Sequence, residues 1–201
     1  MSAAAPKIEF WCEFASTYSY LAAMRIEAAA AAAGVTVEWK PFLLGPIFHA
    51  QGWDNSPFNI FPTKGRYMVR DMERLAAERG LRFALPKPFP QNSLLAARLA
   101  LVGAEEGWIA PFTRAVFTVE FADGAQIADR SVLASILDGL RLDSQRLLSR
   151  TEQPEIKDRL KRQTADAQEL GIFGAPSFVC GGELFWGDDR LEQALAWAKR
   201  A

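Results

Sequence analysis

Two serines, Ser16 and Ser19, stand where an apolar strand-like run over residues 8–14 gives way to a helical pattern. Their spacing is that of a Cys-x-x-Cys pair in which both sulfurs are replaced by hydroxyls. The N-terminus of a helix lowers the pKa of a thiol, so a turn of this kind is suited to hold a thiolate. Serine cannot supply that thiolate. A sulfur bound here would have to come from another molecule.

A second segment, Gly174-Ala175-Pro176-Ser177-Phe178, looks like the proline loop that faces such a site. Each segment also has a plain structural interpretation when taken alone. Ser16 is suited to cap a helix, which is a common role of serine. Pro176 would ordinarily be trans and would begin an edge strand, because only about 5–6% of X-Pro bonds in folded proteins are cis.

The elements that must position these residues begin with a strand over 8–14, a helix over 18–33 and a strand over 35–42. Apolar residues alternate with polar ones in the first strand, which is partly apolar on both faces, as a central strand should be. A strand-helix-strand unit of this length predicts parallel pairing with a right-handed crossover.

The middle of the chain shows no strand pattern. Gly, Pro and Asn predict a loop over 45–63. Helices are predicted over 64–79, 93–106, 109–121, 130–138, 143–150 and 154–170. After Gly171, strands over 177–180 and 183–186 flank the two-residue turn Gly181-Gly182, and a helix over 189–200 follows.

The predicted fold is therefore α/β: a thioredoxin-like βαβ…ββα sheet interrupted by a large all-helical insertion. Residues 1–44 and 171–201 would form a discontinuous thioredoxin-like domain, and residues 45–170 a helical insertion domain.

Composition narrows the class of protein. The chain has 201 residues, 50% of them hydrophobic, and a formal net charge of -1. This charge argues against binding nucleic acid, whose phosphates must be neutralised. No run of lysine and arginine favours a membrane surface, and no run approaches the roughly 20 apolar residues of a membrane span. Residues 1–7 lack the pattern of a secretory signal, so a cytoplasmic protein is expected.

The metal-binding residue types are scarce. Cys12 and Cys180 lie in separate apolar runs, which predicts buried, reduced thiols, and the sequence leaves open whether they are neighbours across the sheet. His49 is the single histidine and has no recognisable partner, so it is expected to be structural or exposed. No metal site is predicted.

Four segments together resemble the family of 2-hydroxychromene-2-carboxylate isomerases, which belongs with the kappa-class glutathione transferases in the DsbA-like branch of the thioredoxin superfamily. They follow one another in the family order and span most of the chain. They are Phe14–Ala22, Pro62–Tyr67, Gly174–Phe178 and Phe185–Leu191. The chain departs from the family pattern at Thr17, where the family usually has proline; since a proline there would only pre-set the first helical turn, the site is expected to survive.

The resemblance implies glutathione as cofactor, with Ser16 holding its sulfur as a thiolate. It also implies a cis bond before Pro176, so that the backbone of Ala175 pairs with the cysteinyl part of glutathione. The further residues implied are Asp188 and Asp189 at the amino end of the γ-glutamyl group, Lys64 and Asn55 elsewhere on glutathione, and Gln91 and Asn92 as donors to a substrate carboxylate. Asp188 and Asp189 are equally well placed to cap the last helix, and Lys64 and Asn55 to be solvated loop residues.

A group of aromatic and proline side chains is a further candidate wall for an aromatic substrate, although such residues more often belong to a core. They are not counted as site residues. The group comprises Trp53, Phe58, Phe61, Pro90 and Trp186.

The leading hypothesis is a glutathione-dependent isomerase of the 2-hydroxychromene-2-carboxylate isomerase type, acting on a small aromatic carboxylate in the degradation of aromatic compounds. A kappa-type glutathione transferase or a glutathione-dependent reductase is an alternative with the same cofactor. A non-catalytic thioredoxin-like binding module is an alternative of another class. Relatives in the family are commonly dimers, so a homodimer is expected.

Overall fold

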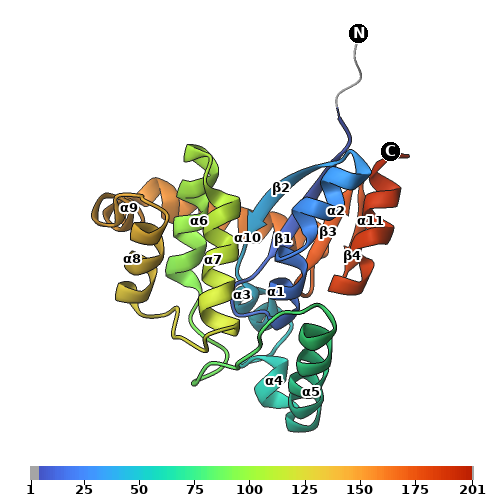
Figure 1. Cartoon of the computed structure of the whole chain (residues 1–201), viewed down its shortest axis with the longest axis horizontal. Helices are drawn as coiled ribbons and strands as arrows, with labels where there is room; N and C mark the ends of the chain where they lie inside the picture. Colours follow the sequence, from blue (N-terminus) through green and yellow to red (C-terminus); the bar gives the residue numbers. More distant parts are fainter. Residues whose placement is uncertain (1–4, 201) are drawn as a thin grey trace.

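The protein is seen in a computed structural model that describes residues 5–200. The prediction about a secretory signal concerns residues 1–7, of which 1–4 lie outside the described residues. A four-stranded sheet in the order β2-β1-β3-β4 forms one half of the molecule (Figure 1). Its strands are β1 (Lys7–Cys12), β2 (Thr36–Pro41), β3 (Ser177–Cys180) and β4 (Glu183–Trp186). β1 is parallel to β2 and antiparallel to β3, which confirms the predicted thioredoxin-like sheet.

β1 is an inner strand, paired with β2 on one edge and β3 on the other, and its side chains are covered on both faces. Phe10 packs against Trp39 of β2 and Phe178 of β3, with ring centroids 5.1 and 5.5 Å apart. On the opposite face Trp11 packs against Phe42, 5.9 Å away. Buried aromatic pairs of this kind stabilise a sheet beyond their area burial. They fix the strand whose carboxyl end runs into the serine turn.

The register of the antiparallel pair brings the two predicted site segments together. Trp11 lies opposite Ser177, so residues 175 and 176 come beside the chain that follows Trp11. The same register separates the cysteines: Phe10 is opposite Phe178, which places Cys180 near the start of β1 and Cys12 near its end. The two thiols are buried, free and not neighbours across the sheet.

The helix predicted over 18–33 is two helices, α1 (Thr17–Ala23) and α2 (Ile26–Ala33). The break falls at Arg25, whose φ of -127° leaves the helical region. Its guanidinium reaches Asp188 and Glu192 near the other end of the chain. The single-helix prediction is wrong because this long-range ion pair is invisible to a local hydrophobic pattern. α2 ends at Gly34 in the left-handed conformation, as the sequence predicts.

The predicted loop over 45–63 is also wrong, because it contains α3 (Leu44–Ala50), α4 (Pro57–Ile60) and the start of α5 (Pro62–Glu78). α4 begins after Ser56, whose hydroxyl accepts the Phe58 N–H, with Pro57 at the first helical position. α5 likewise begins on a proline, Pro62. In Figure 1, α4 and α5 form a separate projection at the bottom of the molecule.

The remaining helices lie within a few residues of their predicted ranges. α6 to α9 stand on the side of the molecule away from β4 (Figure 1). The helices are α6 (Leu94–Glu106), α7 (Ile109–Phe121), α8 (Arg130–Gly139), α9 (Ser144–Arg150), α10 (Pro154–Glu169), the short 3-10 helix η1 (Asp188–Arg190) and α11 (Leu191–Ala198). Within residues 5–200 no helix combines the length and the apolar character that a bilayer crossing requires.

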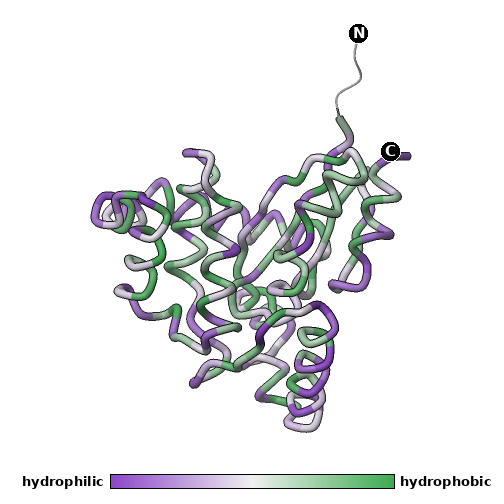
Figure 2. Tube along the Cα trace, in the orientation of Figure 1, coloured by the Kyte–Doolittle hydropathy of each residue, from purple (hydrophilic) through white to green (hydrophobic). Residues whose placement is uncertain are grey.

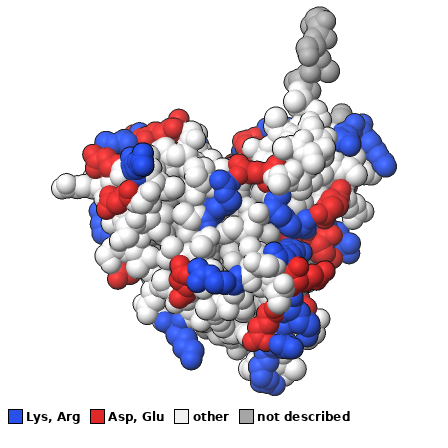
Figure 3. Space-filling view, viewed as in Figure 1, with Lys and Arg blue, Asp and Glu red and all other residues white. Residues whose placement is uncertain are grey.

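One continuous apolar core joins the sheet to the helical segment. Phe14, just after β1, packs against Phe112 and Phe117 of α7, and Figure 2 shows the apolar positions of these helices on their inner sides. A second, smaller cluster on the other face of β1 joins Trp11 and Phe42 to Ile172 and Ala175. The proline loop therefore rests on packed side chains. On the face shown in Figure 3, acidic and basic side chains are interspersed.

Candidate active site

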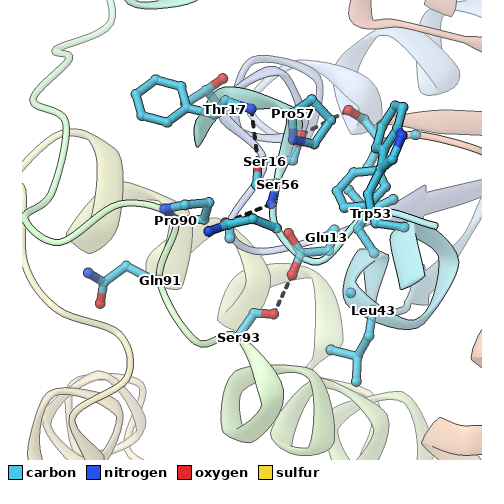
Figure 4. Close-up of a pocket in the computed structure, with 18 of the residues that line it drawn as sticks. Glu13, Ser16, Thr17, Leu43, Trp53, Ser56, Pro57, Pro90, Gln91 and Ser93 are labelled. Atoms are coloured by element: carbon cyan, nitrogen blue, oxygen red, sulfur yellow. Dashed lines mark hydrogen bonds between the residues drawn. The ribbon is translucent and has the colours of Figure 1, made fainter. Parts of the chain in front are cut away.

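A cavity of about 930 Å³ opens where the chain after β1, the start of α1 and the proline loop face helices α3, α4 and α5. Its lining includes Ser16, which Figure 4 labels. It also includes Ala175 from the proline loop and Lys64 from α5. The loop before α6 closes another side with Pro90 and neighbouring residues. A pocket of this size is in the range that holds small-molecule ligands. The two segments that the sequence singled out for chemistry thus share one cavity.

Ser16 is the N-cap residue of α1, and its hydroxyl both accepts and donates a hydrogen bond. Its Oγ accepts the Ser19 N–H at 3.2 Å and donates to the Ala175 carbonyl at 2.9 Å. Its own N–H donates to the Glu13 carbonyl at 3.0 Å. Ser16 is therefore an N-cap and a cavity residue at once. Because α1 has only seven residues, the functional group of the site is the Ser16 hydroxyl rather than the helix end.

The proline loop has the conformation that the family resemblance implies. The bond between Ala175 and Pro176 is cis. Gly187 N–H donates to the Pro176 carbonyl at 3.0 Å, which ties the turn after β4 to this loop. Gly174 must lack a side chain, because a Cβ there would lie 2.4 Å from the Trp186 indole nitrogen. Ala175 lines the cavity, whereas Pro176 is not part of the lining.

Lys64 and Asn55 both reach the cavity lining, from α5 and from the turn before α4. The Lys64 ammonium lies 5.0 Å from the centre of the Phe61 ring. It makes no ion pair with any of residues 5–200, so its charge is available to an anionic ligand. Asn55 accepts hydrogen bonds from the Ser56 N–H at 2.8 Å and from the Asn59 amide at 2.9 Å. Its own amide nitrogen is left for a ligand.

Gln91 and Asn92 also line the cavity, but their groups are already partly committed. The Gln91 amide nitrogen donates to the Pro88 carbonyl, while its buried Oε1 has no hydrogen-bond partner among the described residues. Asn92 Oδ1 accepts the Leu94 N–H at 3.0 Å. Gln91 therefore offers an acceptor to the cavity where the sequence analysis expected a donor.

Asp188 and Asp189 are not in the cavity lining. Asp188 is buried, and its two oxygens accept from Arg25 Nε at 3.1 Å and from an Arg79 nitrogen at 2.6 Å. This carboxylate joins the α1–α2 break to the end of α5. Asp189 is exposed on the turn that Gly187 ties to the proline loop. Of the two carboxylates, only that of Asp189 is exposed, and it pairs with Arg190 at 3.7 Å.

Most of the aromatic candidates do reach the cavity. Trp53, Phe58, Pro90 and Trp186 line it, and Phe61 does not. The sequence analysis missed Phe89 and Phe173, which join the same walls. Phe173 and Trp186 form an exposed pair with ring centroids 4.9 Å apart. His49 is exposed at the cavity edge.

The main residue that sequence reasoning missed is Glu13. Its side chain is 5% exposed, lines the cavity and accepts a hydrogen bond from the Ser93 hydroxyl, drawn as a dashed line in Figure 4. Burial raises the pKa of this carboxyl to about 7, against the opposing effect of the Ser93 and Ala15 hydrogen bonds. The alternation of residues 8–14 does not single out Glu13 as a site residue. A cue was available: Glu13 lies three residues before Ser16.

Comparisons with known proteins agree with this geometry. A family model described as a DSBA-like thioredoxin domain matches residues 7–196. The 2-hydroxychromene-2-carboxylate isomerase of Sphingobium xenophagum is 26% identical over 92% of this chain and 94% of that protein. Glutathione s-transferase kappa 2 of Caenorhabditis elegans is 26% identical over 92% and 86%. A solved structure of a 2-hydroxychromene-2-carboxylate isomerase has a TM-score of 0.87 at 25% identity, covering 96% and 95% of the two chains. The resemblance read from the motifs is confirmed.

Proposed function

This chain belongs to the family of DSBA-like thioredoxin domains, and we propose that it is a glutathione-dependent isomerase of the 2-hydroxychromene-2-carboxylate isomerase type. One observation carries the proposal: the Ser16 hydroxyl is hydrogen-bonded to the Ala175 carbonyl, beside a cis proline and at the wall of a large cavity. The site has the position of a dithiol centre but no thiol of its own. The thiolate of bound glutathione would take the place of the missing protein thiol.

The Ser16–Ala175 hydrogen bond is the contact that glutathione would replace. A sulfur anion is a better acceptor than a carbonyl oxygen, because hydrogen bonds to charged groups are the stronger ones. A Ser16 hydroxyl that donated to a sulfur would leave the Ala175 carbonyl without its present donor. That carbonyl would then be available to accept the N–H of the cysteinyl residue, as in an added strand. Ser16 stabilises the thiolate and lowers the pKa of the glutathione thiol from about 8.5.

The two ends of glutathione meet charges on opposite parts of the site. The unpaired ammonium of Lys64 suits the glycine carboxylate, with the Asn55 amide beside it. Asp189, exposed on the turn tied to the proline loop, suits the ammonium of the γ-glutamyl group. Asp188 is committed to Arg25 and Arg79 and takes no part in binding. These assignments rest on placement and charge.

The remaining space is suited to a flat aromatic acid. Trp53 and Phe58 give the cavity aromatic walls, and Gln91 and Asn92 place amide groups at its polar side. Bound glutathione would supply a thiolate for reversible nucleophilic addition to a conjugated carbon and would be returned unchanged. Ser16 would stabilise the sulfur before addition and on departure.

A kappa-type glutathione transferase is the second candidate, because the Caenorhabditis elegans relative bears that name at the same identity as the isomerase. The two functions differ in what happens to glutathione. An isomerase returns it, and a transferase consumes it in a conjugate. Chromatography of glutathione before and after turnover separates them.

The cellular setting is also part of the proposal. We expect a cytoplasmic homodimer that takes a small aromatic carboxylate as substrate and binds neither nucleic acid nor membrane. Light scattering tests the dimer: a mass near twice 22.3 kDa supports it, and a mass near 22.3 kDa contradicts it.

The test of the site compares Ser16→Ala with Ser19→Ala. Both changes remove one hydroxyl, but Ser19 is buried and outside the cavity lining. We expect Ser16→Ala to lower kcat about a hundredfold, the cost of losing one donor to a developing anion. Ser19→Ala should keep most of the activity. Equal activity in the wild type and Ser16→Ala would contradict the proposed role.

A further inference from the structure

Two buried carboxyl groups lie beneath the candidate active site and have no cation beside them. Glu13 lines the cavity, and Glu120 of α7 is 0% exposed. Both Glu120 oxygens are buried without a hydrogen-bond partner among the described residues. Glu13 is met by the Ser93 hydroxyl, at the start of α6. A fold does not bury two unpaired acids for stability, because each costs free energy unless it stays protonated.

We propose that the Glu13 carboxylate is the proton acceptor for the thiol of bound glutathione, while Glu120 remains protonated and holds no share in the transfer. The inference rests on the proposed function, since it needs a thiol at Ser16. The sulfur–hydrogen bond breaks, its electron pair stays on sulfur, and the proton forms the O–H bond of Glu13. The negative charge thereby moves from Glu13 to the thiolate at Ser16.

Glu13 and Ser16 share one turn and line the same cavity. The Ser16 N–H donates to the Glu13 carbonyl at 3.0 Å, so the two residues form one turn, and both side chains line the cavity. Figure 4 shows the Glu13 carboxyl directed toward Ser93. The Ser93 hydroxyl holds the carboxylate oriented and supplies its one side-chain hydrogen bond.

The titratable groups around Glu13 favour a proton on it whenever a thiolate is present. Glu120 faces it from α7, and the neighbouring Cys12 thiol is buried; burial raises the pKa of both groups, with the charge of Glu13 as a second cause. Neither supplies positive charge. Lys64 and His49 lie on the exposed side of the cavity, and Asp54 adds a further acid there. Two anions in this space repel each other, so one proton serves either Glu13 or the sulfur.

Glu13 and Glu120 differ in their surroundings, and this difference decides which of them can exchange a proton. Glu13 has a hydrogen-bond donor and an opening to the cavity, and its pKa of about 7 allows it to lose its proton near neutral pH. Glu120 has neither, and burial holds its pKa well above the ordinary range. Two acids with different environments commonly take different roles in one site. The titrating acid is the one that can exchange a proton with a ligand.

The experiment counts the protons released when glutathione binds, by calorimetry in buffers of different ionisation enthalpy. At about pH 8 the free thiol is largely protonated and the free Glu13 largely ionised, so wild type should release almost no proton. At about pH 6 Glu13 already holds a proton, and release should approach one. Release that rises as the pH falls is the signature of an internal acceptor.

Glu13→Gln removes the acceptor, so it should release most of a proton at both pH values. Glu9→Gln is the matched control on the same strand: its carboxylate accepts from the Trp11 indole at 3.0 Å and is outside the cavity lining. It should behave as wild type. Glutathione binding with equal release in wild type and Glu13→Gln would overturn the inference and leave the proposed function standing. Wild type that binds no glutathione would overturn both. If Glu13→Gln does not fold, the pH dependence of wild type decides.

Discussion

Replacing Glu13 by glutamine should stabilise this protein at alkaline pH and not at acid pH. The ordinary pKa of a glutamate is 4.5, and burial raises that of Glu13 to about 7. Between these values the native state binds more protons than the unfolded state, so the free energy of unfolding falls as the pH rises. The favourable contribution is fully present below pH 4.5 and is lost as the pH passes through about 7. At about 1.4 kcal/mol for each pH unit, the loss is on the order of 3 kcal/mol.

Glu13→Gln has no group to ionise, and its amide oxygen can still accept from the Ser93 hydroxyl. Its free energy of unfolding, minus that of wild type, should therefore rise by on the order of 3 kcal/mol between about pH 4.5 and pH 8. Urea unfolding of both proteins at the two pH values measures this, and the subtraction cancels other titrating groups. Glu120→Gln should show a rise at least as large, because burial raises the pKa of Glu120 well above its usual value while the unfolded chain ionises this carboxyl. A difference that stays constant for Glu13→Gln would refute the assignment.

Four further substitutions separate binding from stability. Lys64→Ala should weaken glutathione binding about two- to fivefold, the size expected of an exposed charge pair, and calorimetry measures it; unchanged affinity would remove Lys64 from the site. Asp188→Asn should lower the free energy of unfolding by about 2–3 kcal/mol, because Arg25 and Arg79 lose a buried partner. Asp189→Asn should instead lower glutathione affinity and leave the free energy of unfolding unchanged. The reverse pattern would contradict the roles assigned to the two residues. Gly174→Ala should displace the Trp186 indole from the cavity wall, since the new Cβ would lie 2.4 Å from its nitrogen, and raise the substrate KM; an unaltered Trp186 fluorescence and KM would argue that this wall is not used.

The parts of the site that could be predicted are those whose signals are local. Ser16 and the proline loop each occupy a short segment with a characteristic order of residue types, and the hairpin turn Gly181-Gly182 has a simple sequence pattern. The sheet order then follows from the sequence of elements, because a parallel unit and an antiparallel hairpin leave few ways to pair.

The parts that could not be predicted depend on residues far apart in the chain. The break at Arg25 exists because of Asp188 and Glu192, more than 160 positions away. Asp188 was expected at glutathione, but a sequence does not show that two arginines occupy it. Glu13 has no local signal that marks it as a buried acid, and the Ser93 hydroxyl that contacts its carboxyl lies 80 positions away, before α6. Helices α3 and α4 have only seven and four residues, too few to show a helical apolar period, and of the two only α4 begins at a side-chain cap, Ser56.

The most direct test of the central claim is the conversion of 2-hydroxychromene-2-carboxylate, followed spectrophotometrically with and without glutathione. We expect the turnover to depend on glutathione, to leave glutathione unconsumed, and to fall about a hundredfold in Ser16→Ala. Turnover at the same rate without glutathione would contradict this claim.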